Sequence, residues 1–331
     1  MTLTGALASG QIAGLKPAAG SAASGKITVP AGSDAGTDIP VIVLRGAKPG
    51  PTMAIIAGMS GTAYSPFLTA QQLPSKLTLK ELSGTVVVIP LANLPAFAER
   101  TGYLNPIDRK DLNRAFPGRP DGTSSERIAY AITTQVIEPS DSVVILEAGG
   151  SNASLVPHVY QAISGDAKLD AKIASMALEF GISYIVMDRS VKTSKVSPES
   201  AALERSKPVL KVMCGSGGAG DQRMIDTMTK GLLSMMTLFD MVPGHSTKTR
   251  SPQFFDRVTS VESPQTGFIA SFVVRGQNVK KGEPIFGVSG YDGKNPLLVQ
   301  SPLEGILLSI ISTPPVNKGE TAALIGTPRE P

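Results

Sequence analysis

MAIIAG (Met53–Gly58) is a short apolar run that ends in glycine, and runs of the same kind recur along the chain. TVVVIPLAN (Thr85–Asn93) and SVVILEAGG (Ser142–Gly150) are also rich in β-branched residues and stop at polar residues or glycine. Continuous apolar strands of this kind are typical of a mainly parallel sheet that is covered on both faces. Stretches with helical spacing lie between them, for example at 65–73 and 221–239. We therefore predict an α/β fold with a mixed, mainly parallel sheet and helices on both faces.

The C-terminal part of the chain contains a degenerate repeat. GFIASFVVRGQNVKKGEPIFGV (Gly267–Val288) and GILLSIISTPPVNKGETAALIG (Gly305–Gly326) both begin with glycine, pass through an apolar strand and reach Val-x-Lys-Gly-Glu. Two similar strand-turn-strand halves predict a small β-sandwich that resembles a lipoyl or biotinyl module. We accordingly divide the chain into an N-terminal strand-rich segment (1–45), an α/β domain (46–250) and a β-sandwich module (251–331).

Composition and charge exclude several classes of protein. The 331 residues are 41% hydrophobic and 18% charged, which is typical of a globular protein. The net charge of +4 comes without a dense basic run, so we expect no nucleic-acid partner. No apolar stretch is long enough to cross a bilayer, so no membrane partner is expected. The first residues lack the features of a signal peptide, and we expect a cytoplasmic protein, although an exported form with its signal removed would look the same.

The sequence contains few histidines and only incomplete versions of two known catalytic or binding motifs. The chain has only two histidines, His158 and His245, which leaves little imidazole for a zinc site or a Ser-His-Asp triad. GMSGT around Ser60 is similar to a nucleophile elbow but has Thr62 where the second glycine belongs. GSGGAG (Gly215–Gly220) fits a dinucleotide-binding fingerprint, but the helix after it is not followed by the expected second strand. A tight turn is the favoured interpretation of that segment.

The segment DLNRAFPG (Asp111–Gly118) follows one of the buried strands, at the edge of the sheet where ligands bind in such folds. In the order IIAGMSGT, DLNRAFPG, VVILEAGG and VLKVMCGSGG, the chain resembles the succinylglutamate desuccinylase/aspartoacylase family, which are zinc deacylases with a carboxypeptidase-like fold. The resemblance covers most of the chain. It implies that Asn113 and Arg114 hold the carboxylate of a substrate, a task that suits a bidentate guanidinium. In the purely structural alternative, Arg114 pairs with Asp108 or Asp111.

The same resemblance implies that the metal site of the family has changed in this chain. The motif Gly-x-His-Gly-x-Glu corresponds to residues 58–63, which puts Ser60 at the histidine position and Ala63 at the glutamate position. The third ligand position is Glu147, and Met213 stands at the position of the catalytic glutamate. Serine is a poor zinc ligand, alanine is none, and methionine cannot accept a proton. We therefore expect no metal and no other cofactor.

These observations lead to one main functional prediction and two alternatives. The main prediction is a member of the deacylase family that binds a small carboxylated or N-acyl amino-acid-like ligand, or a partner protein, without zinc hydrolysis. One alternative is an active amidohydrolase with altered chemistry that uses Glu147, with Ser60 or Cys214 nearby. The other is a dinucleotide-binding oxidoreductase that uses Gly215–Gly220. Self-association through the edges of the β-module stays open.

Overall fold

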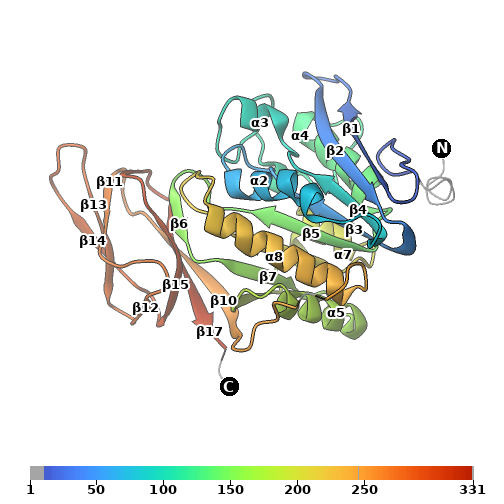
Figure 1. Cartoon of the computed structure of the whole chain (residues 1–331). Coiled ribbons are helices and arrows are strands. Elements are labelled where there is room, and N and C mark those ends of the chain that lie inside the picture. Colours follow the sequence, from blue (N-terminus) through green and yellow to red (C-terminus); the bar gives the residue numbers. More distant parts are fainter. Residues whose placement is uncertain (1–10, 245, 330–331) are drawn as a thin grey trace.

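The computed structural model describes residues 11–244 and 246–329, which form one large mixed sheet with helices on both faces and a small antiparallel sheet (Figure 1). The central strands of the large sheet run parallel to one another and have antiparallel neighbours on both sides. The predicted mixed α/β architecture is therefore confirmed. The spatial order of the strands is β1 (Ser21–Val29), β2 (Thr37–Arg45), β4 (Ser83–Ile89), β3 (Lys48–Ile56), β5 (Ser142–Glu147), β9 (Val209–Met213), β7 (His158–Ala162), β8 (Tyr184–Asp188), β10 (Gln253–Glu262), β17 (Thr321–Pro328), β15 (Gly305–Ile311) and β12 (Asn278–Val279), with β6 (Ala153–Leu155) paired to β15.

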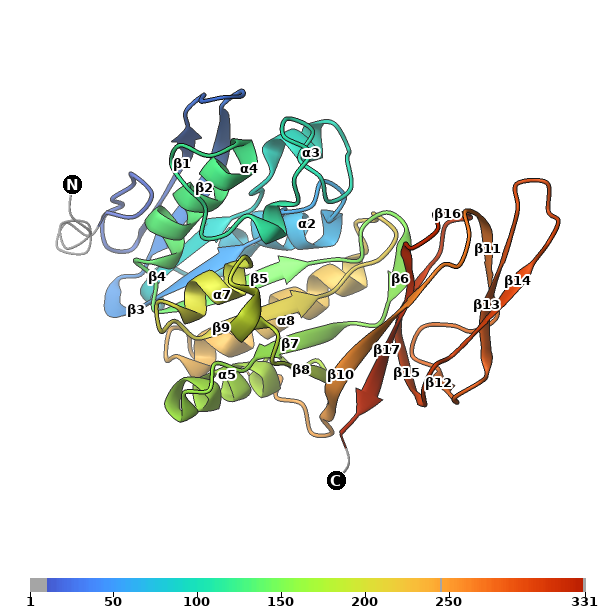
Figure 2. The ribbon, with the colours of Figure 1, turned by 180° about the vertical axis from the view of Figure 1, so that it is seen from behind.

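Helices cover the two faces of this sheet because successive residues of its strands point to opposite sides. Strand β3 sends Ala54 and Ile56 into one buried cluster and Met53 and Ile55 into the other. On the face seen in Figure 1 lie α2 (Tyr64–Gln72), α5 (Ala167–Glu179) and α8 (Gln222–Leu238). On the face seen in Figure 2 lie α4 (Ser124–Ile132) and α7 (Pro198–Leu203). Shorter helical segments are η1 (Leu73–Lys76), α3 (Leu94–Ala98), η2 (Leu112–Arg114), η3 (Thr133–Ile137) and α6 (Val191–Ser194).

The start of α4 corrects an interpretation that the sequence alone favours. Taken with Ser124 as the N-cap, the sequence reads Ser-x-x-Arg, which lacks the glutamate of a capping box. The structure instead has Thr123 as the N-cap, one residue earlier, so that Glu126 stands at the third helical position. Its carboxylate accepts a hydrogen bond from the Thr123 N–H at 2.9 Å. The carboxylate thus binds one of the amide groups that the helix leaves unpaired at its start.

The repeat at the C-terminus folds into two facing sheets. The small sheet contains β14 (Leu297–Gln300), β13 (Pro284–Ser289), β11 (Gly267–Ser271) and β16 (Pro315–Val316), and it packs on β12, β15 and β17 of the large sheet through a shared apolar core. Each half of the repeat gives its short middle strand to the other sheet, because β12 pairs with β15 and β16 pairs with β11. The large sheet continues across the predicted limits at 45/46 and 250/251, and these limits stay a prediction.

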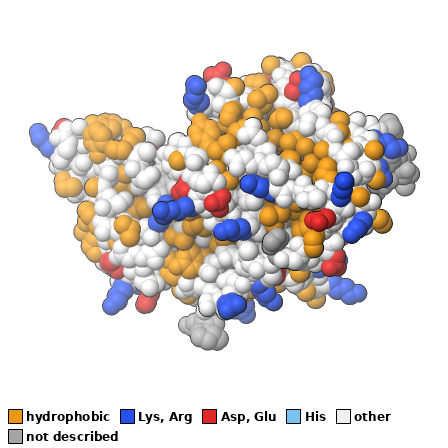
Figure 3. Space-filling model, viewed as in Figure 1, with side chains coloured by type: hydrophobic (Ala, Val, Ile, Leu, Met, Phe, Trp, Pro, Cys, Tyr) orange, Lys and Arg blue, Asp and Glu red, His pale blue; other side chains and the backbone are white. Residues whose placement is uncertain are grey.

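The surface of the β-module exposes several large apolar side chains. Phe272, Val274, Tyr291 and Leu298 are each more than half exposed. Figure 3 shows hydrophobic side chains gathered over this module, at the left of the view, while lysine and arginine side chains are scattered among acidic ones. Such a surface agrees with self-association or a partner protein. Both stay predictions.

The helices of the described residues include none that is long and apolar enough to span a membrane.

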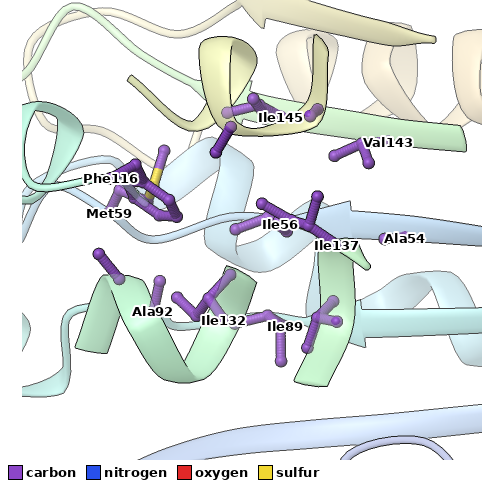
Figure 4. Packing of buried hydrophobic residues seen from close by; sticks show 14 of the residues in the cluster. Ala54, Ile56, Met59, Ile89, Ala92, Phe116, Ile132, Ile137, Val143 and Ile145 are labelled. Atoms are coloured by element: carbon purple, nitrogen blue, oxygen red, sulfur yellow. The ribbon is translucent and has the colours of Figure 1, made fainter. Parts of the chain in front are cut away.

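The core beneath α4 gives a first prediction about stability. Ile56 is fully buried in the cluster that also contains Ile132, Ile137 and Ile145 (Figure 4). Ile56→Val removes one methylene group from this packed interior, and we expect it to lower the free energy of unfolding by about 1 kcal/mol. Urea denaturation measures the effect. A change of the same size for Val274→Ala, at a 69% exposed position, would show that burial is not the cause.

Candidate functional site

A cavity of about 780 Å³ lies at the edge of the sheet where β3, β5 and β9 end. Its lining includes Ser60 and Thr62 from the loop after β3, Glu147 from the end of β5, and Asn113 and Arg114 from η2. Residues of β15 and β17 line it as well, so the C-terminal strands close one side. The sequence predicts a site at this edge because the carboxyl ends of parallel strands meet there. The volume falls in the range of pockets that hold small ligands.

The register of three neighbouring strands sets the order of the side chains on the floor of the cavity. Glu147 of β5 stands opposite Met213 of β9, and Met213 stands opposite His158 of β7. One pleat back, Lys211 of β9 stands opposite Tyr160 of β7. Residues that are paired in register, or two apart along a strand, point to the same face of a sheet. All five side chains therefore share one face, and all five line the cavity.

A short turn brings Asn113, one of the two predicted ligand-binding residues, into contact with Glu147 and leaves Arg114 exposed. Asp111 begins η2, and its Oδ1 accepts a hydrogen bond from the Asn113 N–H at 2.9 Å. Asn113 Nδ2 in turn donates to Glu147 Oε1 at 3.2 Å. The Arg114 side chain is 82% exposed at the rim, with its Nε 3.7 Å from Asp111 Oδ2. The pairing with Asp111 is thus present but long and solvated, and it contributes little to stability.

Glu147 occupies an unusual position for a carboxyl group, since only 4% of it is exposed. Burial raises the pKa of Glu147 from 4.5 to about 7, because the ionised form loses its hydration. The Lys211 ammonium and the Asn113 amide favour the ionised form and oppose this rise, whereas the charge of Asp111 adds to it. The carboxyl group therefore changes its protonation close to neutral pH.

An ion pair inside the cavity joins β9 to α7. Lys211 Nζ lies 3.0 Å from Glu199 Oε1, and the side chains are 20% and 5% exposed. Burial raises the pKa of Glu199, but the Lys211 ammonium and hydrogen bonds more than offset it, so the pKa lies below its usual range. Burial lowers the pKa of Lys211, and the charges of Glu199 and Glu147 raise it above its usual range. Both members of the pair are therefore charged at neutral pH.

His158 is a neutral hydrogen-bond acceptor in this cavity. Its Nδ1 lies 2.7 Å from the Val156 carbonyl oxygen, which can only accept, so Nδ1 carries the hydrogen. Burial is the main reason that the pKa of His158 falls to about 4, and the nearby Lys211 ammonium lowers it further. Nε2 is consequently unprotonated, and it has no hydrogen-bond partner among the described residues. The other histidine, His245, lies outside the described residues.

Two of the predicted candidates lie away from the cavity. Cys214 is buried in the core on the α8 side, where its Sγ contacts the sulfur of Met224 at 3.6 Å. Burial raises the pKa of the Cys214 thiol to about 12, so the reactive thiolate is not formed at neutral pH. Ala63 is buried and does not belong to the cavity lining. Ser60 and Met213 do line it.

Backbone N–H groups of the glycine segment Gly215–Gly220 form hydrogen bonds within the protein. The Gly217 N–H donates to the Ala153 carbonyl at 3.0 Å, and the Gly218 N–H donates to the Gly150 carbonyl at 2.8 Å. After α8 the chain enters β10, which pairs with β8 and β17 and not with β9. These contacts agree with a tight turn, and they give the dinucleotide alternative no support.

The donor set of the described residues does not fit a zinc ion. A catalytic zinc needs about three ligands from His, Cys, Asp or Glu. Within residues 11–244 and 246–329, no three such side chains come together closely enough to hold a metal. The loss of the metal itself stays a prediction.

Three charged residues of the cavity were not predicted from the sequence: Lys211, Glu199 and Asp188. The available signal was a lysine within the otherwise apolar strand VLKVM. A charged residue in a buried strand requires a partner, and here the partner is carried by the short helix α7.

Comparisons with known proteins agree with this fold. Residues 49–239 match the succinylglutamate desuccinylase/aspartoacylase catalytic domain. N-alpha-acetyl-L-2,4-diaminobutyric acid deacetylase of Halomonas elongata is 28% identical over 297 residues, which are 87% of this chain and 85% of that protein. A succinylglutamate desuccinylase structure from a Silicibacter species has a TM-score of 0.84 at 24% identity and covers 93% of this chain and 95% of its own. The product-bound ectoine utilization protein EutE of Ruegeria pomeroyi has a TM-score of 0.83 at 24% identity and covers 92% of this chain and 95% of its own. The chain therefore belongs to the succinylglutamate desuccinylase/aspartoacylase family.

Proposed function

We propose that this protein binds a small N-acyl amino acid, or the carboxylated product of its deacylation, in the cavity around Glu147. The observation that carries this proposal is a set of buried polar atoms without partners. Among the described residues, four cavity-lining side chains each have one such atom: Thr62 Oγ1, Asn113 Oδ1, His158 Nε2 and Glu199 Oε2. Buried polar atoms in native proteins are nearly always paired, so an unpaired group calls for a missing partner. A polar ligand supplies partners to several of them at once.

The rim of the cavity suits the carboxylate of such a ligand. Arg114 carries an exposed guanidinium whose contact with Asp111 is long. A ligand carboxylate can therefore replace Asp111 as the partner of this guanidinium. The fork of N–H groups in arginine matches a carboxylate in a bidentate arrangement. The Halomonas relative, whose name describes the deacetylation of an N-acetyl amino acid, supports the same class of ligand. A protein partner at this rim stays an untested prediction.

A second candidate function is hydrolysis of the acyl bond by this chain itself, and the environment of Glu147 favours it. A general base works best when its pKa lies near the working pH, and that of Glu147 is about 7. The Glu147 carboxylate would take a proton from water while the water oxygen attacks the acyl carbon. The same proton would then pass to the leaving amine, which leaves a carboxylic acid and a free amino acid.

Binding is tested with Arg114→Ala. We expect purified full-length protein to bind Nα-acetyl-L-glutamate by isothermal titration calorimetry, and Arg114→Ala to weaken binding at least about tenfold, because it removes a charged hydrogen-bond donor. The exposed position predicts little change in stability. Arg119→Ala is the matched control, because Arg119 is also exposed, lies in the same loop and does not line the cavity. Equal binding by Arg114→Ala and the wild type would contradict the role of Arg114.

Turnover and metal content separate the two candidate functions. Amino-acid release from Nα-acetyl substrates is measured in the presence of a chelator, and bound zinc is measured by mass spectrometry. Release that persists with the chelator and disappears in Glu147→Gln supports hydrolysis by Glu147. Binding without release assigns a binding protein, and stoichiometric zinc contradicts the expected loss of the metal.

A further inference from the structure

We propose that the acyl chain of the ligand is a neutral apolar chain longer than acetyl, and that it lies against the side of the cavity formed by β6, β15 and β17. This side, the C-terminal wall, consists of the lining residues Ala153, Leu155, Ser309, Ile311 and 321–324. The inference rests on the proposed function and specifies the acyl part of its ligand. Two separate observations carry it, the distribution of charge around the cavity and the register of the three strands.

The charged residues of the cavity are confined to one part of its lining. Three of them, Asp188, Glu199 and Lys211, line the inner part of the cavity, between β7, β8, β9 and α7, and the others are Asp111, Arg114 and Glu147. Among the described residues, the C-terminal wall contributes no aspartate, glutamate, lysine or arginine to the lining. A charged group placed against this wall would lose hydration without gaining a partner of opposite charge. The wall therefore suits a neutral part of the ligand.

The pairing of three strands places apolar side chains next to one another on the C-terminal wall. Ser309 of β15 stands opposite Leu155 of β6 on one side and opposite Leu324 of β17 on the other. Two residues further along β15, Ile311 stands opposite Ala153. Residues that are paired in register, or two apart along a strand, point to the same face of a sheet, and all five line the cavity. Four of these five side chains are apolar, and the fifth carries only a hydroxyl group.

The covalent structure of an N-acyl amino acid decides which of its parts reaches this wall. The carboxylate and the side chain leave the same carbon atom, so a carboxylate held by Arg114 keeps the side chain on the same side of the amide. The acyl chain begins on the other side of the amide and extends away from that carbon. Arg114 lies on η2, which packs on α4, whereas the wall is built on β15 and its neighbours. The acyl chain is therefore the part that extends toward the wall.

The size of the cavity agrees with an acyl chain longer than acetyl. Its volume of about 780 Å³ lies in the upper part of the range of about 300–1,000 Å³ that is typical of pockets for drug-sized ligands. An Nα-acetyl amino acid is smaller than such a ligand, and it has a single methyl group to place against four apolar side chains. Each further methylene group buried against the wall should increase the affinity.

The experiment varies the acyl chain on a constant amino acid. Binding of Nα-acetyl-, Nα-butanoyl- and Nα-hexanoyl-L-glutamate to the full chain is measured by calorimetry at pH 7.5. Nα-succinyl-L-glutamate is measured as well, because its acyl chain ends in a carboxylate where the butanoyl chain ends in a methyl group. We expect the affinity to rise about two- to fourfold for each added methylene group. The succinyl compound should bind at least about tenfold more weakly than the butanoyl compound, because the wall offers its carboxylate no partner.

Two variants test the wall itself. Ser309→Asp places a carboxylate among its apolar side chains and should reduce the ratio of the hexanoyl to the acetyl affinity to below about threefold. Ala153→Leu fills space at a half-buried position of the wall and should reduce the gain from butanoyl to hexanoyl. It adds no charge, so its result stands even if Ser309→Asp does not fold. Ser312→Asp is the matched control, because Ser312 directly follows β15 but is exposed and outside the cavity lining, and it should leave the ratio unchanged.

The outcomes separate this inference from the proposed function. Equal affinities for the three neutral acyl compounds, or tightest binding of the succinyl compound, would overturn the acyl site but not the proposed function. Binding of Nα-acetyl-L-norleucine as tight as that of the hexanoyl compound would assign the wall to an amino-acid side chain and overturn the inference. Failure of all the N-acyl compounds to bind would overturn both.

Discussion

Glu147→Gln is expected to raise the free energy of unfolding by roughly 3 kcal/mol at pH 8 and to change it little at pH 4.5. The pKa of Glu147 is raised from 4.5 to about 7 in the folded protein. A carboxyl group with a raised pKa contributes its full stability below pH 4.5, where it is protonated in both states. That contribution is lost as the pH rises to about 7, because the unfolded chain then holds the carboxylate in water. Each pKa unit corresponds to about 1.4 kcal/mol, which gives the expected size.

Glutamine suits this experiment because it keeps the shape of the side chain and an oxygen that accepts from Asn113. Urea denaturation of the wild type and the variant at pH 4.5, 6 and 8 measures the difference. Glu126→Gln is a control of opposite sign, since the Thr123 N–H lowers the pKa of Glu126 to about 2 against the effect of burial. It should destabilise the protein at pH 8. A gain for Glu147→Gln that is the same at all three pH values would show that ionisation is not its cause.

A stabilising substitution at this position has a functional meaning. A buried carboxyl group that weakens the fold at neutral pH is the arrangement expected of a group retained for binding or catalysis. The gain in stability should therefore accompany a loss of ligand binding or turnover in Glu147→Gln. If neither changes, Glu147 is a structural residue only.

The sequence predicted the architecture well because its signals are local. The apolar run ending at Gly58 contains the end of strand β3, and the run ending at Gly150 contains strand β5. The repeat 267–288 and 305–326 corresponds to two similar halves of the C-terminal module. Strand ends can be read from such runs, and parallel strands bring their carboxyl ends together. For this reason the sequence predicts Asn113 and Glu147, which are 34 residues apart, at the same edge of the sheet, where a hydrogen bond joins them in the structure.

The inner part of the site could not be predicted in this way because it depends on tertiary packing. Glu199 lies on a helix of six residues, too short for its apolar spacing to be recognised. Its partner Lys211 follows twelve residues later, and only the packing of α7 on β9 brings the two charges to 3.0 Å. The burial of Cys214 was not predicted for a similar reason. The side chains of Met213 and Cys214 point to opposite faces of the sheet, so Met213 lines the cavity and Cys214 packs on the α8 side.

Lys211→Met is expected to lower the free energy of unfolding by about 3–5 kcal/mol at pH 7. The substitution keeps most of the apolar stem but leaves the carboxylate of Glu199 buried without its cation, which is the costly way to break a buried ion pair. Replacing both partners is much less costly, because no unpaired charge remains. We therefore expect Lys211→Met/Glu199→Gln to regain most of the lost stability, and a double-mutant cycle by urea denaturation measures the coupling.

The exposed ion pair Lys26–Asp38 is the matched control for this prediction. Its two atoms are closer, at 2.7 Å, but the side chains are 64% and 38% exposed. Water and salt screen such a pair, so Lys26→Met should change stability little. If distance decided the strength of an ion pair, Lys26→Met would cost more than Lys211→Met. Burial should reverse that order, because the carboxylate of Asp38 regains its hydration when Lys26 is removed, whereas that of Glu199, which is only 4% exposed, regains little.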